Sequence, residues 1–287
     1  MNNEPKILAC VDATPAADGV AAYAAWAAVR LQAPLEFLHV LDRHAPVSSP
    51  QDHSGAIGLN AQEKLLTQLS TADELRTRAA REAGRLFLNR LRDRALAAGA
   101  ATVDTRLRHG DVEETLAEQQ AGTRLFVLGR AGASSSTGSA ELGKHLEWVV
   151  RSVNLPVLVA APLYAEPSRV LFAFDGSSIT RRGVAMLAAS PLLKGLPIHL
   201  MMSGVARAHA QAQLASAVQT LTDAGLPVTS ALVPGQPQEV IAAALKDQAF
   251  NLLVMGAYSH SPLRNLFVGS KTSELLKTAR VATLLLR

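Results

Sequence analysis

The chain has 287 residues, 48% of them hydrophobic and 18% charged, with a net charge of +4, and this length suits two domains of about 140 residues each. Its weak positive charge lacks runs of Lys or Arg interleaved with aromatic residues, which argues against a nucleic-acid groove. The single cysteine, Cys10, excludes an internal disulfide, and no apolar run reaches the ~18 residues of a membrane helix, so a cytoplasmic location is expected.

In the first half, short apolar segments that are typical of strands alternate with segments of helical periodicity. The predicted strands are Lys6–Asp12, Leu35–Leu41, Val103–Leu107, Leu125–Leu128 and Pro156–Ala161. The predicted helices are Ala16–Leu31, Ala61–Ala98, Val112–Gln119 and Leu142–Val153. Thr14 and Pro15 fit the cap and first turn of the first helix, while Thr71 followed by Glu74 predicts a capping box that divides the long one.

After a proline-bearing linker, Pro162–Ser168, the same order of segments begins again. Arg169–Asp175 matches Lys6–Asp12 at an offset of 163 (175 − 12), whereas Leu252–Gly256 matches Leu125–Gly129 at an offset of 127 (256 − 129). The offset falls by 36, so the first copy holds that much additional chain between its second and third strands. The chain is therefore predicted to be a tandem repeat with one enlarged copy.

Apolar strands that alternate with helices predict a doubly wound α/β fold, in which a five-stranded parallel sheet is covered on both faces. We predict two such domains, residues 1–162, enlarged between strands 2 and 3, and residues 163–287. Ligands of these folds bind beyond the carboxyl ends of the strands, where the winding direction reverses. Each copy is thus expected to hold one candidate site.

The candidate site of the second half lies around Gly256, which ends an apolar strand and precedes a polar loop. Two residues separate Gly256 from Ser259, and nine more precede Gly269 and Ser270 at the start of a helical segment. Glycine lets a ligand approach the backbone, and a Gly-Ser helix start offers N–H groups and a hydroxyl to an anion. A loop that only connects a strand to a helix is the alternative interpretation.

This spacing resembles the Gly-x2-Gly-x9-Gly-(Ser/Thr) nucleotide-binding signature of the universal stress protein family, with Ser259 in place of the second glycine. If that position needs positive φ, serine would strain the loop by roughly 1 kcal/mol or more and weaken binding. The resemblance covers nearly the whole chain as two copies. It implies a Rossmann-like fold of the adenine nucleotide alpha-hydrolase type, with strand order 3-2-1-4-5.

The resemblance also implies an adenine nucleotide such as ATP, with or without Mg²⁺, in the second half. Asp175 would lie near the sugar or base, the loop after Gly256 against the sugar and phosphates, and Gly269 and Ser270 on the phosphates. Considered alone, Asp175 and the Gly-Ser-Ser that follows it fit a turn and a helix cap equally well.

In the first half, Asp12, Gly129 and Gly132 occupy the corresponding positions. Ten residues rather than nine then precede the third glycine, and Lys144 replaces the Ser or Thr after it. Two interpretations of Arg130 and Lys144 stay open. They attract an anionic ligand other than ATP, or they are solvated charges beside a lost site.

We predict a stress-response regulatory protein that binds a small ligand, an adenine nucleotide, in its second domain. The alternative is an interaction protein with degenerate sites that recruits protein partners without a nucleotide. No histidine pair or cysteine cluster has metal-ligand spacing, so no metal site is predicted. Beyond Asp175 no catalytic group is identified, so at most weak ATP hydrolysis is expected.

The last strand of each half is apolar and would be an exposed edge if left unpaired. The family resemblance implies that such edges pair. Pro156–Ala161 and Val281–Leu286 are therefore predicted to meet within the chain and form a pseudo-dimer, and a further homodimer of whole chains stays open.

Overall fold

The computed structural model describes residues 4–41, 59–130, 143–205, 207–247, 250–257, 275–276 and 279–287. The strands are β1 (Lys6–Cys10), β2 (Leu35–Leu41), β3 (Val103–His109), β4 (Thr123–Gly129) and β5 (Val157–Ala160) in the first half, and β6 (Val170–Ala173), β7 (Ile198–Ser203), β8 (Val228–Val233), β9 (Leu252–Gly256) and β10 (Ala282–Leu286) in the second. The helices are α1 (Ala17–Leu31), α2 (Leu59–Ala97), α3 (Val112–Glu118), α4 (Lys144–Ser152), α5 (Ser178–Ala188), α6 (Ala208–Asp223) and α7 (Pro237–Asp247), with 3-10 turns η1 (Gln120–Gly122) and η2 (Pro191–Leu193).

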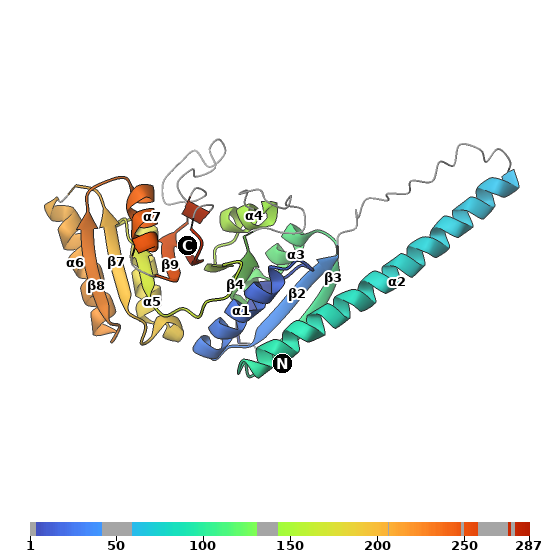
Figure 1. The fold of residues 1–287 in the computed structure, drawn as a ribbon, viewed down its shortest axis with the longest axis horizontal. Helices are drawn as coiled ribbons and strands as arrows, with labels where there is room; N and C mark the ends of the chain where they lie inside the picture. Colours follow the sequence, from blue (N-terminus) through green and yellow to red (C-terminus); the bar gives the residue numbers. More distant parts are fainter. Residues whose placement is uncertain are drawn as a thin grey trace.

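All ten strands form one continuous sheet, in the order β3-β2-β1-β4-β5-β10-β9-β6-β7-β8 (Figure 1). Within each half the strands run parallel, in the order 3-2-1-4-5 that the family resemblance implies. Side chains of one strand alternate between two buried layers: Ile7 and Ala9 lie in the layer of α1, and Leu8 lies in the layer of α4. Helices therefore cover both faces, which confirms the doubly wound α/β fold.

The two halves join where β5 and β10 pair antiparallel. Leu158 lies opposite Leu284 and Val157 opposite Leu285, and the side chains of both strands are buried. This confirms the prediction that the last strands meet within the chain. The pairing leaves neither apolar strand as an exposed edge.

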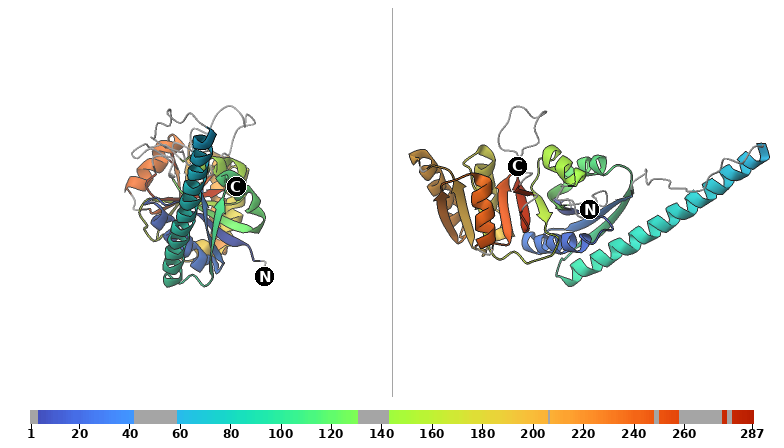
Figure 2. Two further views of the ribbon diagram at one scale, coloured as in Figure 1. Left: turned by 90° about the vertical axis from the view of Figure 1, so that its right-hand side faces the viewer. Right: turned by 45° about the horizontal axis from the view of Figure 1, so that its top comes forward.

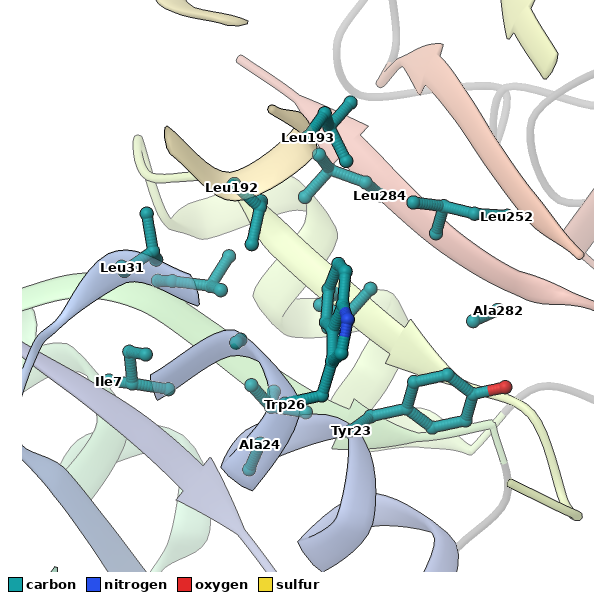
Figure 3. Close-up of a cluster of buried hydrophobic side chains, with 14 of the residues drawn as sticks. Ile7, Tyr23, Ala24, Trp26, Leu31, Leu192, Leu193, Leu252, Ala282 and Leu284 are labelled. Atoms are coloured by element: carbon teal, nitrogen blue, oxygen red, sulfur yellow. The ribbon is translucent and has the colours of Figure 1, made fainter. Parts of the chain in front are cut away.

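A second contact between the halves lies on one face of the sheet, where α1 packs against η2. The Trp26 side chain points from α1 toward Leu192 and Leu284 of the second half (Figure 3) and is 7% exposed. Arg30 adds a hydrogen bond from Nε to the Leu192 carbonyl oxygen, at 3.0 Å. Apolar burial and strand pairing together therefore hold the two halves as one body.

The enlarged segment of the first half contains α2, which has 39 residues, whereas α6 at the equivalent place has 16. The predicted division at Thr71 and Glu74 is wrong, because α2 runs without a break from Leu59 to Ala97. Residues with high helix propensity flank that position on both sides, and they outweigh a capping signal that requires a non-helical first residue. Only the last part of α2 packs on the sheet, and the rest projects beyond it (Figures 1 and 2).

A histidine of the second half links stability to pH. His199 Nδ1 lies 2.8 Å from Thr229 Oγ1, and its ring stacks on Phe250, over which Arg169 also lies. Burial, and then the charge of Arg169, lower the pKa of His199. Because the unfolded chain binds this proton more tightly, the stabilising contribution is present above the ordinary histidine pKa of about 6.5 and is lost as the pH falls below it.

This prediction is tested by measuring the urea concentration at the midpoint of unfolding at pH 7.5 and at pH 5.5, for wild type and for His199→Asn. We expect wild type to lose more stability between these two pH values than His199→Asn, which cannot take up the proton. Equal losses in the two proteins would show that His199 does not contribute.

Candidate functional site

The candidate site of the second half lies at the carboxyl ends of β6 and β9. These strands are neighbours, and Ala173 lies opposite Met255, so Asp175, just after β6, and Gly256, the last residue of β9, lie at adjacent strand ends. In the first half Ala9 lies opposite Val127, which places Asp12 beside Gly129 in the same way. The structure thus brings together one acid and one glycine in each half.

The carboxylate of Asp175 holds the turn that leads into α5. Its Oδ1 accepts hydrogen bonds from the Ser177 N–H at 3.0 Å and from the Thr180 hydroxyl at 2.7 Å, and Ser177 is the N-cap residue of α5. The structure therefore shows the turn and helix cap that the sequence allowed for Asp175 and the residues after it. The carboxylate therefore has a fixed position at the edge of the sheet.

Asp12 makes a similar local contact, because its Oδ1 accepts a hydrogen bond from the Thr14 hydroxyl at 2.6 Å. The prediction that Thr14 caps α1 is wrong: the N-cap is Ala16, and no side chain caps that helix. The hydroxyl of Thr14 bonds to the nearby carboxylate instead of to the helix N–H groups.

Gly256 has a packing role. A Cβ atom at this position would lie 3.2 Å from Thr180 Cγ2 and 3.3 Å from Ile179 Cγ2, which is closer than most van der Waals contacts. The absence of a side chain therefore lets the first turn of α5 approach the end of β9.

A cavity of about 370 Å³ opens at the same edge of the sheet, between β7, β8 and α7. Its lining residues are Met201, Val233, Pro234, Gly235, Glu239, Val240, Ala243 and Ala244. Met201 lies opposite Ala173 of β6, so the cavity is next to the strand that leads to Asp175, although Asp175 and Gly256 do not line it. Its lining is largely apolar, with one carboxylate.

The sequence prediction did not include this cavity, although one signal was available. Gly110 and Gly235 precede α3 and α7 at equivalent places in the repeat, and both have positive φ, 143° and 132°. A glycine repeated just before a helix marks a backbone turn that other residues rarely adopt. It could have directed attention to the loop after the third strand of each half.

The other predicted site residues, Ser259, Gly269, Ser270 and Gly132, lie outside the described residues, and so does the side chain of Lys144. Gly143 is described: it is the N-cap of α4, and its N–H donates to the Arg130 carbonyl oxygen at 2.8 Å. The structure thus places Asp175, Gly256, Asp12 and Gly129, and the roles of the remaining residues stay predictions.

The structure gives Arg130 a contact within the chain that neither interpretation included. Its guanidinium donates to the carbonyl oxygens of Leu276 and Val281 in the second half. Burial lowers the pKa of this guanidinium to about 10, which leaves it charged at neutral pH. Arg130 therefore links the first half to the second. It directly follows Gly129, the last residue of β4 and the first glycine of the candidate motif in the first half.

Arg287 makes a comparable contact in the opposite direction, because its Nη2 donates to the Val150 carbonyl oxygen. Val150 belongs to the last turn of α4, and Leu276 is also helical. The two acceptors are 126 residues apart (276 − 150), which is also the separation of Gly269 from Gly143 (269 − 143). Each half thus receives a guanidinium from the other at an equivalent helical carbonyl, where positive charge is favourable.

Two classes of site find no support among the residues that the structure describes. No group of three or more His, Cys, Asp and Glu side chains there could hold a metal ion. Burial, and then the charge of Asp12, raise the pKa of the Cys10 thiol to about 12, so it is not a reactive thiolate. In the same described parts, no helix is long and apolar enough to cross a membrane.

Comparison with known proteins gives one consistent family. The model of the universal stress protein family matches residues 5–161 and again residues 167–287. A universal stress protein of Synechocystis sp. is 31% identical over 284 residues, which cover 98% of this chain and 99% of that protein.

Solved structures agree in fold. A universal stress protein from Archaeoglobus fulgidus superposes with a TM-score of 0.69 at 14% identity, covering 99% of this chain and 96% of the other. A putative universal stress protein from Pseudomonas aeruginosa gives a TM-score of 0.61 at 18% identity, covering 99% and 93%. These similarities extend through both halves of the chain.

Proposed function

The chain belongs to the universal stress protein family, as two tandem copies, and on that premise we propose that it is a stress-response regulatory protein that binds an adenine nucleotide of the ATP type in its second half. The observation that carries the proposal is the apolar cavity between β7, β8 and α7, beside the strand that leads to Asp175. Apolar walls with a few polar groups suit a purine base and its ribose. The proposed location of the protein is the cytoplasm.

In this proposal the residues that line the cavity contact the base and the sugar of the nucleotide. The phosphates would lie against Gly269 and Ser270, with Ser259 in the intervening loop. Mg²⁺, if bound, would accompany the phosphates. Asp175 already accepts two hydrogen bonds that fix the start of α5, so its proposed role is to orient the ligand rather than to catalyse hydrolysis.

The first half is the weaker candidate for this ligand. Arg130, directly after Gly129, donates hydrogen bonds to carbonyl oxygens of the second half. Lys144 occupies the position where the family signature has Ser or Thr. We therefore propose one nucleotide site per chain. A second candidate function, recruitment of protein partners without a nucleotide, is favoured by Ser259 at the expected glycine position.

A phenylalanine that fills the cavity tests the proposal. Ala243 lines the cavity and is exposed, so Ala243→Phe is expected to block the space without disturbing the core. Titration calorimetry of the nucleotide-stripped protein with ATP and magnesium should show binding weakened by about tenfold or more, which corresponds to at least about 1.4 kcal/mol.

The matched control is Ala242→Phe, since Ala242 is the preceding residue of α7, is also exposed and is not among the residues that line the cavity. It should bind ATP like wild type, whereas Gly269→Asp should remove binding through the phosphates. Circular dichroism checks that all three variants are folded. Absence of heat and of thermal stabilisation by millimolar ATP in wild type would favour the partner-recruiting function instead.

A further inference from the structure

The projecting part of α2 has one face turned away from the body of the molecule. Among the residues of α2 whose burial is described, Gly84, Leu88, Leu91 and Ala95 are buried, and they mark the face that packs on β2, β3 and α1. Gly84 follows Leu75 by nine residues, or about 2.5 turns, so Leu75 points the opposite way. The outward face thus begins beyond the sheet and continues alongside it.

Two leucines make this outward face apolar. Leu75 and Leu86 are each 62% exposed, although leucine is usually buried. They are eleven residues apart, close to three turns, so they lie on one stripe along the helix. Ala79 lies between them on the same stripe and would let another helix approach closely.

A stripe of charges runs beside the leucines, and its signs alternate. Glu74, Arg78, Glu82 and Arg85 follow one another at spacings of four, four and three, and all four are exposed. Neighbours at these spacings lie on one side of a helix. From the amino end the signs are minus, plus, minus, plus, and from the carboxyl end they are plus, minus, plus, minus. Two such stripes placed antiparallel therefore set each charge opposite one of the other sign.

From this pattern we propose that the outward face of α2 is a self-association surface, and that it pairs antiparallel with α2 of a second copy of this chain. In one register Leu75 meets the partner's Leu86 and Glu74 meets the partner's Arg85. Arg78 meets the partner's Glu82 in the same register. Each contact occurs twice because the pair is two-fold symmetric.

The position of α2 permits this arrangement. Where the side chains of α2 are described, at residue 71 and residues 74–97, the body packs on the face opposite to the leucines, near the carboxyl end of the helix (Figure 2). In an antiparallel pair the two bodies lie toward opposite ends of the pair, and neither stands between the helices. The surface is therefore open to the partner helix along the whole stripe.

Sedimentation equilibrium of the full chain tests the proposal. At chain concentrations of about 10 to 100 µM, wild type should approach the mass of two chains, because interfaces of modest size associate in this range. Leu75→Glu should return the mass to that of one chain. Thr77→Glu, two residues away on the side opposite to the leucines, introduces the same side chain and should leave the two-chain mass unchanged.

Reversing the charges of Arg78 and Glu82 distinguishes this register from non-specific apolar association. Arg78→Glu alone places like charges opposite the partner's Glu82 and should weaken association by about tenfold. The double variant Arg78→Glu/Glu82→Arg restores opposite signs at every contact and should recover it, and about 0.5 M NaCl should weaken wild type. A one-chain mass at all concentrations, or a dimer that Leu75→Glu leaves intact, would overturn the proposal.

Discussion

Replacing Arg130 by methionine is expected to lower the free energy of unfolding by about 3 kcal/mol, because each hydrogen bond from a charged group contributes about 1.5–3 kcal/mol. Methionine keeps the apolar stem of the side chain but cannot donate to Leu276 and Val281. Those two carbonyl oxygens then lose their guanidinium donor at a buried junction. Urea denaturation followed by far-ultraviolet circular dichroism measures the change.

Arg124→Met is the matched control, since Arg124 lies on the same strand β4 but is exposed. Its effect should stay within about 0.5 kcal/mol. A wild-type midpoint for Arg130→Met, combined with a weaker affinity for an anion, would return Arg130 to the role of a ligand-binding charge.

Replacing Trp26 by alanine should cost about 4 kcal/mol, in the range of about 3–5 kcal/mol for large aromatic side chains removed from a core. The indole lies between α1 and the second half, near Leu192 and Leu284, so the cavity that it leaves opens at the junction (Figure 3). Both halves share this contact, and we expect them to unfold together at a lower urea concentration.

Val29→Ala in the same helix is the control, because Val29 is 43% exposed and its truncation should change stability by less than about 0.5 kcal/mol. Fluorescence of Trp148, which lies in α4, reports unfolding of the first half, and far-ultraviolet circular dichroism reports unfolding of both halves together. If the second half kept the wild-type midpoint in Trp26→Ala while the first half unfolded early, the junction would not couple the halves.

Most of the fold could be predicted from the sequence because its signals are local and repeated. Short apolar strands alternate with helices, and the match of Arg169–Asp175 to Lys6–Asp12 gives every element a second copy as a check. The order of strands within each half came from the family resemblance and is confirmed. The pairing of the two last strands follows from the general need to cover an apolar edge.

Of the candidate site, the sequence predicts only the part that strand order determines. Carboxyl ends of neighbouring parallel strands meet at one edge, so Asp175 and Gly256 could be placed together. The cavity depends on how α7 packs over Met201 and Val233, which no local pattern encodes.

The contacts of Arg130 are also not encoded by any local pattern in the sequence. Its acceptors are 146 and 151 residues away in the chain, whereas its neighbourhood in the sequence, beside a glycine motif, predicted a charge that faces either an anionic ligand or solvent. A long flexible cation can bond to any carbonyl within its reach. Its partner is therefore fixed by tertiary structure alone.

The unequal lengths of α2 and α6 determine how many copies an assembly can hold. A symmetric pair of single-domain subunits would carry two projecting helices, and antiparallel pairing through both would link pair to pair into an open chain. Here the halves are joined covalently and only the first has the long helix. Each chain thus offers one such helix, so the proposed association through α2 would stop at two copies and give a closed assembly of four domains.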